Sequence, residues 1–176
     1  LNLFWLSLNS GTTNDQFTDA QIVDQFDHVR LQTGNISRIK SLRALAASQG
    51  KTITFWLYHM PQMPATFFAE WSEINANETW FLHNDGTTSA HRVRWPQGSA
   101  TRYVMDLSLQ AVRNYWVDKI VTDLMAPYAY DGYFNDVAPS LRGSRPWTIG
   151  PTAQQIADFP EWGLSLAQEM KAALGG

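Results

Sequence analysis

The fold is decided by residues 128–139, which read YAYDGYFNDVAP. An aromatic and apolar run of strand type begins at Asp131 and Gly132 and ends at Asn135 and Asp136, before Pro139. A carboxylate at the end of a parallel strand lies at the edge where α/β and barrel folds place their active sites. Asp136 is therefore the first candidate for a catalytic residue. The alternative is that Asp136 only caps the turn before the next helix.

Composition bounds the class of protein. The 176 residues suffice for one core, and 44% hydrophobic with 16% charged residues is typical of a folded globule. A net charge of -3 gives no basic surface, so we expect neither a nucleic-acid nor a membrane partner. The absence of cysteine excludes thiol nucleophiles, thiolate metal sites and disulfides. Eight Trp and 13% aromatic residues favour sugar stacking, although aromatic residues also fill cores.

Strands and helices alternate along most of the chain. The strand patterns fall at residues 3–8, 27–32, 52–59, 102–106 and 131–136. The helix patterns begin after Thr18, Ser37 and Ser108, with a further helix at 65–76. The pattern at 27–32 also fits a continued helix.

Five βα units favour the α/β class and the first part of a (β/α)8 TIM barrel. We expect residues 1–176 to form one barrel domain that is a segment of a longer chain. The alternative is an open doubly wound sheet, but no Gly-rich phosphate loop follows the first strand.

Two regions outside the regular pattern also carry predictions. Residues 80–83 and 93–95 have the pattern of a small hairpin, with Asp85 in the turn chemistry between them. Long irregular segments of this kind more often have a function than none. Near the C-terminus, we expect a short helix at 152–158 and a second helix that starts at Pro160.

Alternation assigns side chains to the two faces of the strands. Trp56 and Tyr58 are expected to point into the barrel, away from the helices. Asp136 shares a face with Phe134, and Asp106 ends the preceding strand, so two carboxylates would meet at one rim and divide acid and base roles. The alternative for Asp106 is a capping role next to Ser108. Asp131 faces the other way, at the N-terminal end of its strand, and is interpreted as structural.

Two of the four histidines are candidate polar groups of the site, but their spacing is not that of a metal site. His59, at the end of its strand, and His83, in the irregular segment at 78–100, are placed to reach the opening of the barrel that the loops surround. The four His show no metal-binding spacing such as i, i+4 on a helix, so no metal or other cofactor is expected. Either histidine can also be an ordinary satisfied polar residue.

Several short motifs resemble those of a known family. DGYFND at 131–136 is preceded by YVMDLS at 103–108, VRNYW at 112–116 and WFLHNDG at 80–86. Together they resemble bacterial glycoside hydrolases whose barrels are related to the α-amylase and α-galactosidase group. The likeness covers residues 52–140.

The resemblance implies a barrel hydrolase of α-linked or otherwise modified polysaccharide. Asp136 matches the catalytic carboxylate at the end of a central strand, and Asp106 matches a carboxylate of the substrate pocket. The chain departs from the pattern at Phe134, where α-amylases carry an Arg. In amylase-like barrels the acid is a Glu on the strand after the nucleophile, and this chain ends before that strand would begin.

Glycoside hydrolysis needs two carboxyl groups, about 5 Å apart for retention and roughly 6.5 to 9.5 Å apart for inversion. Asp136 supplies one. Its partner is Asp106, Asp85 or a residue outside the 176, and we favour the last. The expected substrate-binding residues, which stack on sugar rings or bond their hydroxyls, are Trp56, Tyr58, His59, His83, Asp85, Trp95 and Asn135.

Three functions fit these residues. The first is a glycoside hydrolase outside the cytoplasm, at the cell surface or secreted. The second is a non-catalytic carbohydrate-binding or assembly module, which the missing second carboxylate favours. The third, a metal-assisted hydrolase using His59, Asp106 and Asp136, lacks the spacing of a metal site. A half-barrel would leave strand edges open, so we expect it to need its remaining strands or a partner subunit.

Overall fold

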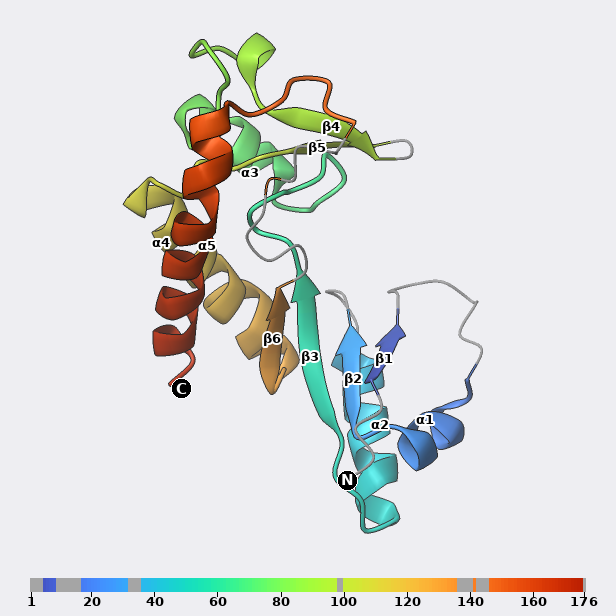
Figure 1. Ribbon diagram of the computed structural model, residues 1–176. Coiled ribbons are helices and arrows are strands. Elements are labelled where there is room, and N and C mark those ends of the chain that lie inside the picture. The colour runs from blue at the N-terminus through green and yellow to red at the C-terminus, as the bar shows by residue number, and fades with distance from the viewer. Residues whose placement is uncertain are drawn as a thin grey trace. The chain divides into compact units, whose positions relative to one another are not determined.

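The computed structural model describes residues 5–8, 17–31, 36–97, 100–135, 141 and 146–175. The chain divides into two compact units. The first comprises Leu1–His59 and Asp118–Asp136, and the second comprises Met60–Val117 and Val137–Gly176. Each unit has its own helices, strands and buried side chains (Figure 1).

The first unit is built on a parallel sheet of four strands in the order β1-β2-β3-β6. The strands are β1 (Trp5–Leu8), β2 (His28–Leu31), β3 (Thr54–His59) and β6 (Gly132–Asn135). Helix α1 (Asp19–Gln25) joins β1 to β2, and α2 (Ile36–Ser48) joins β2 to β3. Figure 1 shows all four arrowheads at one edge of the sheet, so the carboxyl ends of the strands share that edge.

Local signals explain where the helices begin and end. Thr18 caps α1, because its Oγ1 accepts a hydrogen bond from the Gln21 amide at 3.3 Å while the Gln21 side chain accepts from the Thr18 amide at 2.9 Å. Gly50 follows α2 with a φ of 69°, a left-handed conformation that favours glycine at a helix end. These predicted helices, and strand β2 between them, are confirmed.

One face of the sheet carries the core of this unit. Val29, Leu31, Phe55 and Leu57 are fully buried, and the apolar side chains Ile22, Ile39 and Leu42 come from α1 and α2. Helix α2 lies on this face, since the Arg43 guanidinium sits 5.4 Å from the centre of the Phe55 ring.

Asp131 fastens the start of β6 to this core. Its Oδ2 accepts hydrogen bonds from the Phe55 amide at 2.8 Å and from Arg43 Nη2 at 2.6 Å. Arg43 also donates to the carbonyl of Ala129, a residue with a positive φ of 53° that turns the chain toward β6. The structural role predicted for Asp131 is confirmed.

The expected helix after Ser108 is present in three pieces. Helix α4 (Gln110–Asp118) continues as the π-helix η3 (Lys119–Met125), and the 3-10 turn η4 (Ala126–Tyr128) with Pro127 ends it. Val112 and Trp116 are buried in the second unit, and Ile120 and Leu124 are buried in the first.

The second unit consists of short elements around an antiparallel pair. Strand β4 (Arg94–Gln97) pairs with β5 (Ala100–Tyr103). The helical elements are α3 (Trp71–Asn75), η1 (Glu78–Trp80), η2 (Ser89–His91) and α5 (Ala153–Ala173). None of the helices in the described ranges is long and apolar enough to cross a bilayer.

The prediction of a parallel strand at 102–106 is wrong. Strand β3 pairs directly with β6, and β5 lies in the separate antiparallel pair. The amides of Val104, Met105 and Asp106 donate to the carbonyls of Val93, Gln62 and Trp80, all within the second unit. Alternation correctly marks the segment as extended, but it does not determine which neighbour satisfies the backbone. The parallel sheet therefore has four described strands where five were expected.

Two further predictions meet opposite outcomes. The hairpin pairing is confirmed by an antiparallel bridge between His83 and Arg92 and by a 2.8 Å hydrogen bond from the Val93 amide to the Leu82 carbonyl. The two separate helices near the C-terminus are wrong, because α5 runs unbroken through Pro160. Its buried stripe at Phe159, Gly163, Leu166 and Met170 continues past the proline, and this packing offsets the cost of about 3 kcal/mol of a proline inside a helix.

Candidate functional site

The sheet of the first unit has a second face that carries polar and aromatic side chains. Strand register places these residues on it: His28, Arg30, Thr54, Trp56, Tyr58, Gly132 and Phe134. Gly132 is buried, and the others are half-buried, while the alternate residues Val29, Phe55 and Leu57 are fully buried. We call this set the polar face. The predicted orientation of Trp56 and Tyr58, opposite Phe55 and Leu57, is confirmed.

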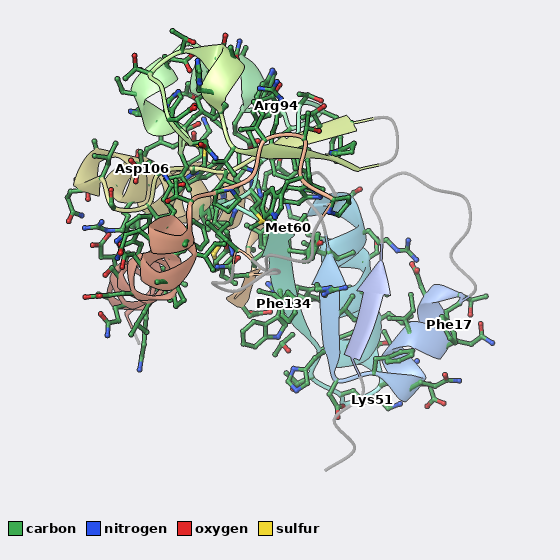
Figure 2. The ribbon with its side chains drawn as sticks, turned by 45° about the horizontal axis from the view of Figure 1, so that its top comes forward. Phe17, Lys51, Met60, Arg94, Asp106 and Phe134 are labelled. Carbon is green, nitrogen blue, oxygen red and sulfur yellow. The ribbon has the colours of Figure 1, made fainter. Side chains whose placement is uncertain are left out.

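Arg30 joins three strands on the polar face. Its Cζ lies 4.6 Å from the ring centre of Tyr58 on β3 and 4.6 Å from that of Phe134 on β6. The two rings stack, with centres 6.2 Å apart and planes inclined at 23°. Figure 2 labels Phe134 beside the β3–β6 pair. Both distances are within cation–π range, so the rings hold the guanidinium against β3 and β6.

Trp56 lies across β6 because Gly132 has no side chain. A Cβ at Gly132 would stand 2.5 Å from Cζ3 of the indole, which is closer than real contacts allow. Trp56 Nε1 donates to Thr54 Oγ1 at 3.3 Å, and Thr54 Oγ1 also lies 2.5 Å from His28 Nδ1. Glycine and threonine thus fix the orientation of the indole.

The residues that end β3 and β6 lie on the other face. Register pairs His59 with Asn135, and His59 is only 5% exposed. The Tyr133 hydroxyl donates to the His59 carbonyl at 3.4 Å, and burial raises the pKa of this hydroxyl, which therefore stays protonated. Asn135 Oδ1 is buried and has no hydrogen bond to any residue within the described ranges. The candidate Asp136 follows directly and lies outside the described residues.

Asp106 lies in the second unit, in the turn before α4 (Figure 2). Its Oδ1 accepts hydrogen bonds from the Ser108 amide at 3.1 Å and from Ser108 Oγ at 2.5 Å. Its own amide donates to the Trp80 carbonyl at 2.8 Å. This is the geometry of the capping role that the sequence left open for Asp106.

His83 belongs to an ionic cluster centred on Glu78 and Arg92. His83 Nε2 lies 2.8 Å from Glu78 Oε1, which also accepts from Arg92 Nε at 2.9 Å. Arg92 makes a second, short bond to Glu78 Oε2 and donates to Asn75 Oδ1 at 2.7 Å. Hydrogen bonds from Arg92, reinforced by His83, lower the pKa of Glu78 from 4.5 to about 2 despite its partial burial.

Asp85 and Trp95 also have partners within the second unit. Asp85 Oδ1 lies 2.6 Å from His91 Nδ1, and the His91 ring covers Gly86 so closely that a Cβ there would be 2.6 Å from it. Trp95 is 6% exposed and packs edge-on against Trp147, with ring centres 5.3 Å apart. Its burial leaves no open ring face for a sugar.

The predicted site residues therefore divide between the units. Trp56 and Tyr58 share the polar face of the first unit, while Asp106, His83, Asp85 and Trp95 belong to the second. Sequence reasoning missed Arg30, although its alternation with Val29 and Leu31 already placed it away from the core. In the described part of the chain, no group of three His, Asp or Glu side chains is arranged to hold a metal ion.

Comparisons with known proteins give a likeness of structure. No family model and no curated protein matches the sequence. Among solved structures, a GH31 family sulfoquinovosidase from E. rectale superposes with a TM-score of 0.66 at 13% identity, covering 99% of this chain and 29% of that one. The glycoside hydrolase domain of PelA from Pseudomonas aeruginosa gives 0.62 at 13% identity, covering 98% and 56%.

A GH36 α-galactosidase, AgaA from Geobacillus stearothermophilus, gives a TM-score of 0.57 at 17% identity, covering 98% of this chain and 26% of that one. The chain thus spans about a quarter to just over half of the length of these proteins. All three are glycoside hydrolases whose structures superpose on nearly the whole of this chain. The chain has a glycoside hydrolase-like fold.

Proposed function

We propose that this chain belongs to a glycoside hydrolase that acts on an oligosaccharide or polysaccharide, with its sheet forming part of a (β/α)8 barrel. The polar face carries the proposal: the half-buried Arg30, Trp56, Tyr58 and Phe134 stand opposite a fully buried apolar face. Aromatic planes beside hydrogen-bonding groups suit a sugar, whose rings have apolar and hydroxylated surfaces. The structural likeness to three glycoside hydrolases supports the same reaction class.

Asp136 is the proposed nucleophile or base. It follows Asn135, the last residue of β6, and stands two positions after Phe134 in the sequence. Strand alternation from Phe134 would direct its carboxylate to the polar face. A carboxylate there would attack the anomeric carbon or activate a water molecule.

The second carboxyl group is expected from outside the 176 residues. Asp106 uses Oδ1 to cap the turn at Ser108, and Asp85 pairs with His91, so each already has a local partner. A barrel that encloses a sugar also needs strands beyond the four described here. Further strands of the same protein, or a partner subunit, would complete it. We propose an extracellular or cell-surface location, where polymeric sugars are found.

The test compares the intact parent protein with its Asp136→Asn variant on a panel of polysaccharides, with release of reducing ends as the readout. Asp123→Asn is the matched control, because Asp123 pairs with Lys119 at the surface of η3. We expect Asp136→Asn to lower activity at least about 1000-fold and the control to leave it unchanged. Equal activity of the two variants, with folding intact, would exclude Asp136 as the catalytic group.

The alternative is a non-catalytic carbohydrate-binding or assembly module. It is favoured by the local bonds of Asp106 and Asp85, which engage both of the candidates within this chain for the second carboxylate. Binding of a sugar by the parent protein without turnover, at the same affinity in Asp136→Asn, would establish this module.

A further inference from the structure

Phe67 is an aromatic residue of the second unit that stays largely uncovered. It is 67% exposed, compared with 55% for Leu164 on α5. We propose that Phe67 is the stacking platform of a carbohydrate-binding position on the second unit, where it holds a sugar ring of a polysaccharide. The inference rests on the proposed function and adds a binding position to that of the polar face. It gives Phe67 no part in bond cleavage.

The exposed ring belongs to a turn that is fixed to β5. The Phe68 amide donates to the carbonyl of the fully buried Ala65 at 3.0 Å, so Thr66 and Phe67 are the two central residues of a β-turn. The Thr66 amide donates to the Thr101 carbonyl of β5 at 3.2 Å. These bonds hold the backbone on both sides of Phe67, so the ring projects from a fixed base.

Phenylalanine is unusual at the centre of a turn. Gly, Pro, Asn, Asp and Ser are the residues that turn geometry favours. An exposed phenyl ring also forgoes the free energy that its burial would contribute. Departures from local preference are typical of functional positions, and loops on a fixed scaffold are where binding residues are common. The position of Phe67 therefore indicates a ligand for its ring.

Two neighbours orient the ring from within the second unit. Phe68 lies edge-on to it, with ring centres 5.3 Å apart and planes inclined at 69°. Cζ of the buried Arg102 lies 5.8 Å from the Phe67 ring centre, within cation–π range, while Nη1 of Arg102 donates to the Met63 carbonyl at 2.9 Å. A ring held in this way loses little conformational entropy when a ligand stacks on it.

The chemistry around the ring suits a neutral sugar. Residues 64–69 read PATFFA and carry no charge. A phenyl face packs against the apolar face of a sugar ring. The side chains of Thr66, which is exposed, and Thr101, which is half-buried, are hydroxyls that can donate to or accept from sugar hydroxyls. Stacking with a few neutral hydrogen bonds is thus the recognition that this surface offers.

The test measures binding in the Asp136→Asn background of the parent protein, so that hydrolysis does not interfere. The probes are insoluble starch, cellulose, chitin and xylan, and co-sedimentation gives the bound fraction. Phe67→Ala removes the ring, Phe67→Leu keeps apolar volume without a flat face, and Phe67→Tyr keeps the ring. Leu164→Ala is the matched control, because it removes another exposed apolar side chain of the same unit.

We expect the parent to bind at least one of these polymers. Phe67→Ala and Phe67→Leu should weaken that binding about 3- to 10-fold, whereas Phe67→Tyr and Leu164→Ala should stay within about twofold. With Asp136 intact, Phe67→Ala should raise KM for the polymer by a similar factor and leave kcat unchanged. Its hydrolysis of p-nitrophenyl monosaccharide glycosides should equal that of the parent, because such a substrate occupies only the position where its bond is cleaved.

The results that would overturn the inference are distinguishable from failure of the proposed function. If the parent binds a polymer and the Phe67 variants bind it equally well, the ring holds no sugar, and a carbohydrate function still stands. If Phe67→Ala changes only the mass measured by analytical ultracentrifugation, the ring covers a protein interface instead. If no polymer binds and reducing ends are never released, the proposed function fails together with the inference. Circular dichroism of each variant confirms that folding is unchanged.

Discussion

The two units use their polar side chains in opposite ways. In the first, the alternation along β2 and β3 buries Val29, Leu31, Phe55 and Leu57 and leaves the polar face outside the core. In the second, short elements are held by side-chain contacts such as those of Glu78 with Arg92 and His83. A regular sheet satisfies its own backbone, so its other face is available for chemistry, whereas irregular segments need polar groups to hold them.

Two arginines make the same contrast. Arg92 is 4% exposed, donates to Glu78 and Asn75, and lies 3.7 Å from the Phe81 ring centre. Arg30 is half-buried and contacts two rings on a face that presents further aromatic groups. The first arginine stabilises a loop region, and the second connects strand β2 to β3 and β6 through its ring contacts.

The largest expected effect tests the packed face of the first unit. Phe55→Ala removes a fully buried ring that contacts Arg43, and we expect it to lower the free energy of unfolding by about 3 to 5 kcal/mol. Thr52→Ala, at an exposed position just before β3, is the control and should change stability by less than about 0.5 kcal/mol. Urea unfolding followed by circular dichroism measures both. Equal stabilities would contradict the division into a packed face and a polar face.

The sequence predicts the first unit better than the second, for a physical reason. Hydrophobic periodicity and the cap at Thr18 locate α1, α2, β2 and β3, because each signal is local. Residues 102–106 show the same alternation, yet their amides bond to Val93, Gln62 and Trp80. Pairing depends on segments distant in sequence, which periodicity does not reveal.

In the candidate site too, local signals are predictable from the sequence and long-range contacts are not. Alternation places Trp56 and Tyr58 on one face, and the structure confirms it. The contact of Arg30 with Phe134 depends on β3 and β6 being neighbours, although more than seventy residues separate them in the chain. Asp106 bonds to the side chain of Ser108, and Asp85 lies against that of His91. Such contacts follow from turn geometry and leave no periodic signal in the sequence.

An effect of intermediate size tests the order of the polar face itself. Gly132→Ala would place a methyl group 2.5 Å from the Trp56 indole, so the ring or the strand has to shift. We expect a loss of about 1 to 3 kcal/mol in the free energy of unfolding and a change in tryptophan fluorescence. In a Trp56→Ala background the same substitution should cost less than about 0.5 kcal/mol, because the clash is gone. Additive costs would show that Trp56 does not lie over Gly132.

The smallest expected effect is the pH dependence of the stability that the ionic cluster of the second unit contributes. Hydrogen bonds from Arg92 lower the pKa of Glu78 to about 2 in the folded protein, compared with 4.5 for an ordinary glutamate. The folded state therefore binds fewer protons at this group than the unfolded state does, and stability rises with pH across that interval. The contribution is complete above about pH 4.5 and is lost as the pH falls toward 2.

Urea unfolding at pH values from 2 to 6 measures this contribution. Glu78→Gln removes the titrating group. Glu161→Gln, at an exposed position of α5, is the matched control. Between pH 4.5 and 2, the free energy of unfolding of the parent and of the control should fall more steeply than that of Glu78→Gln. The slopes against pH should differ by the equivalent of up to one bound proton. Solvent screening reduces the difference, since the Glu78 side chain is 35% exposed. Parallel curves would mean that Arg92 does not hold Glu78 ionised as the pH falls toward 2.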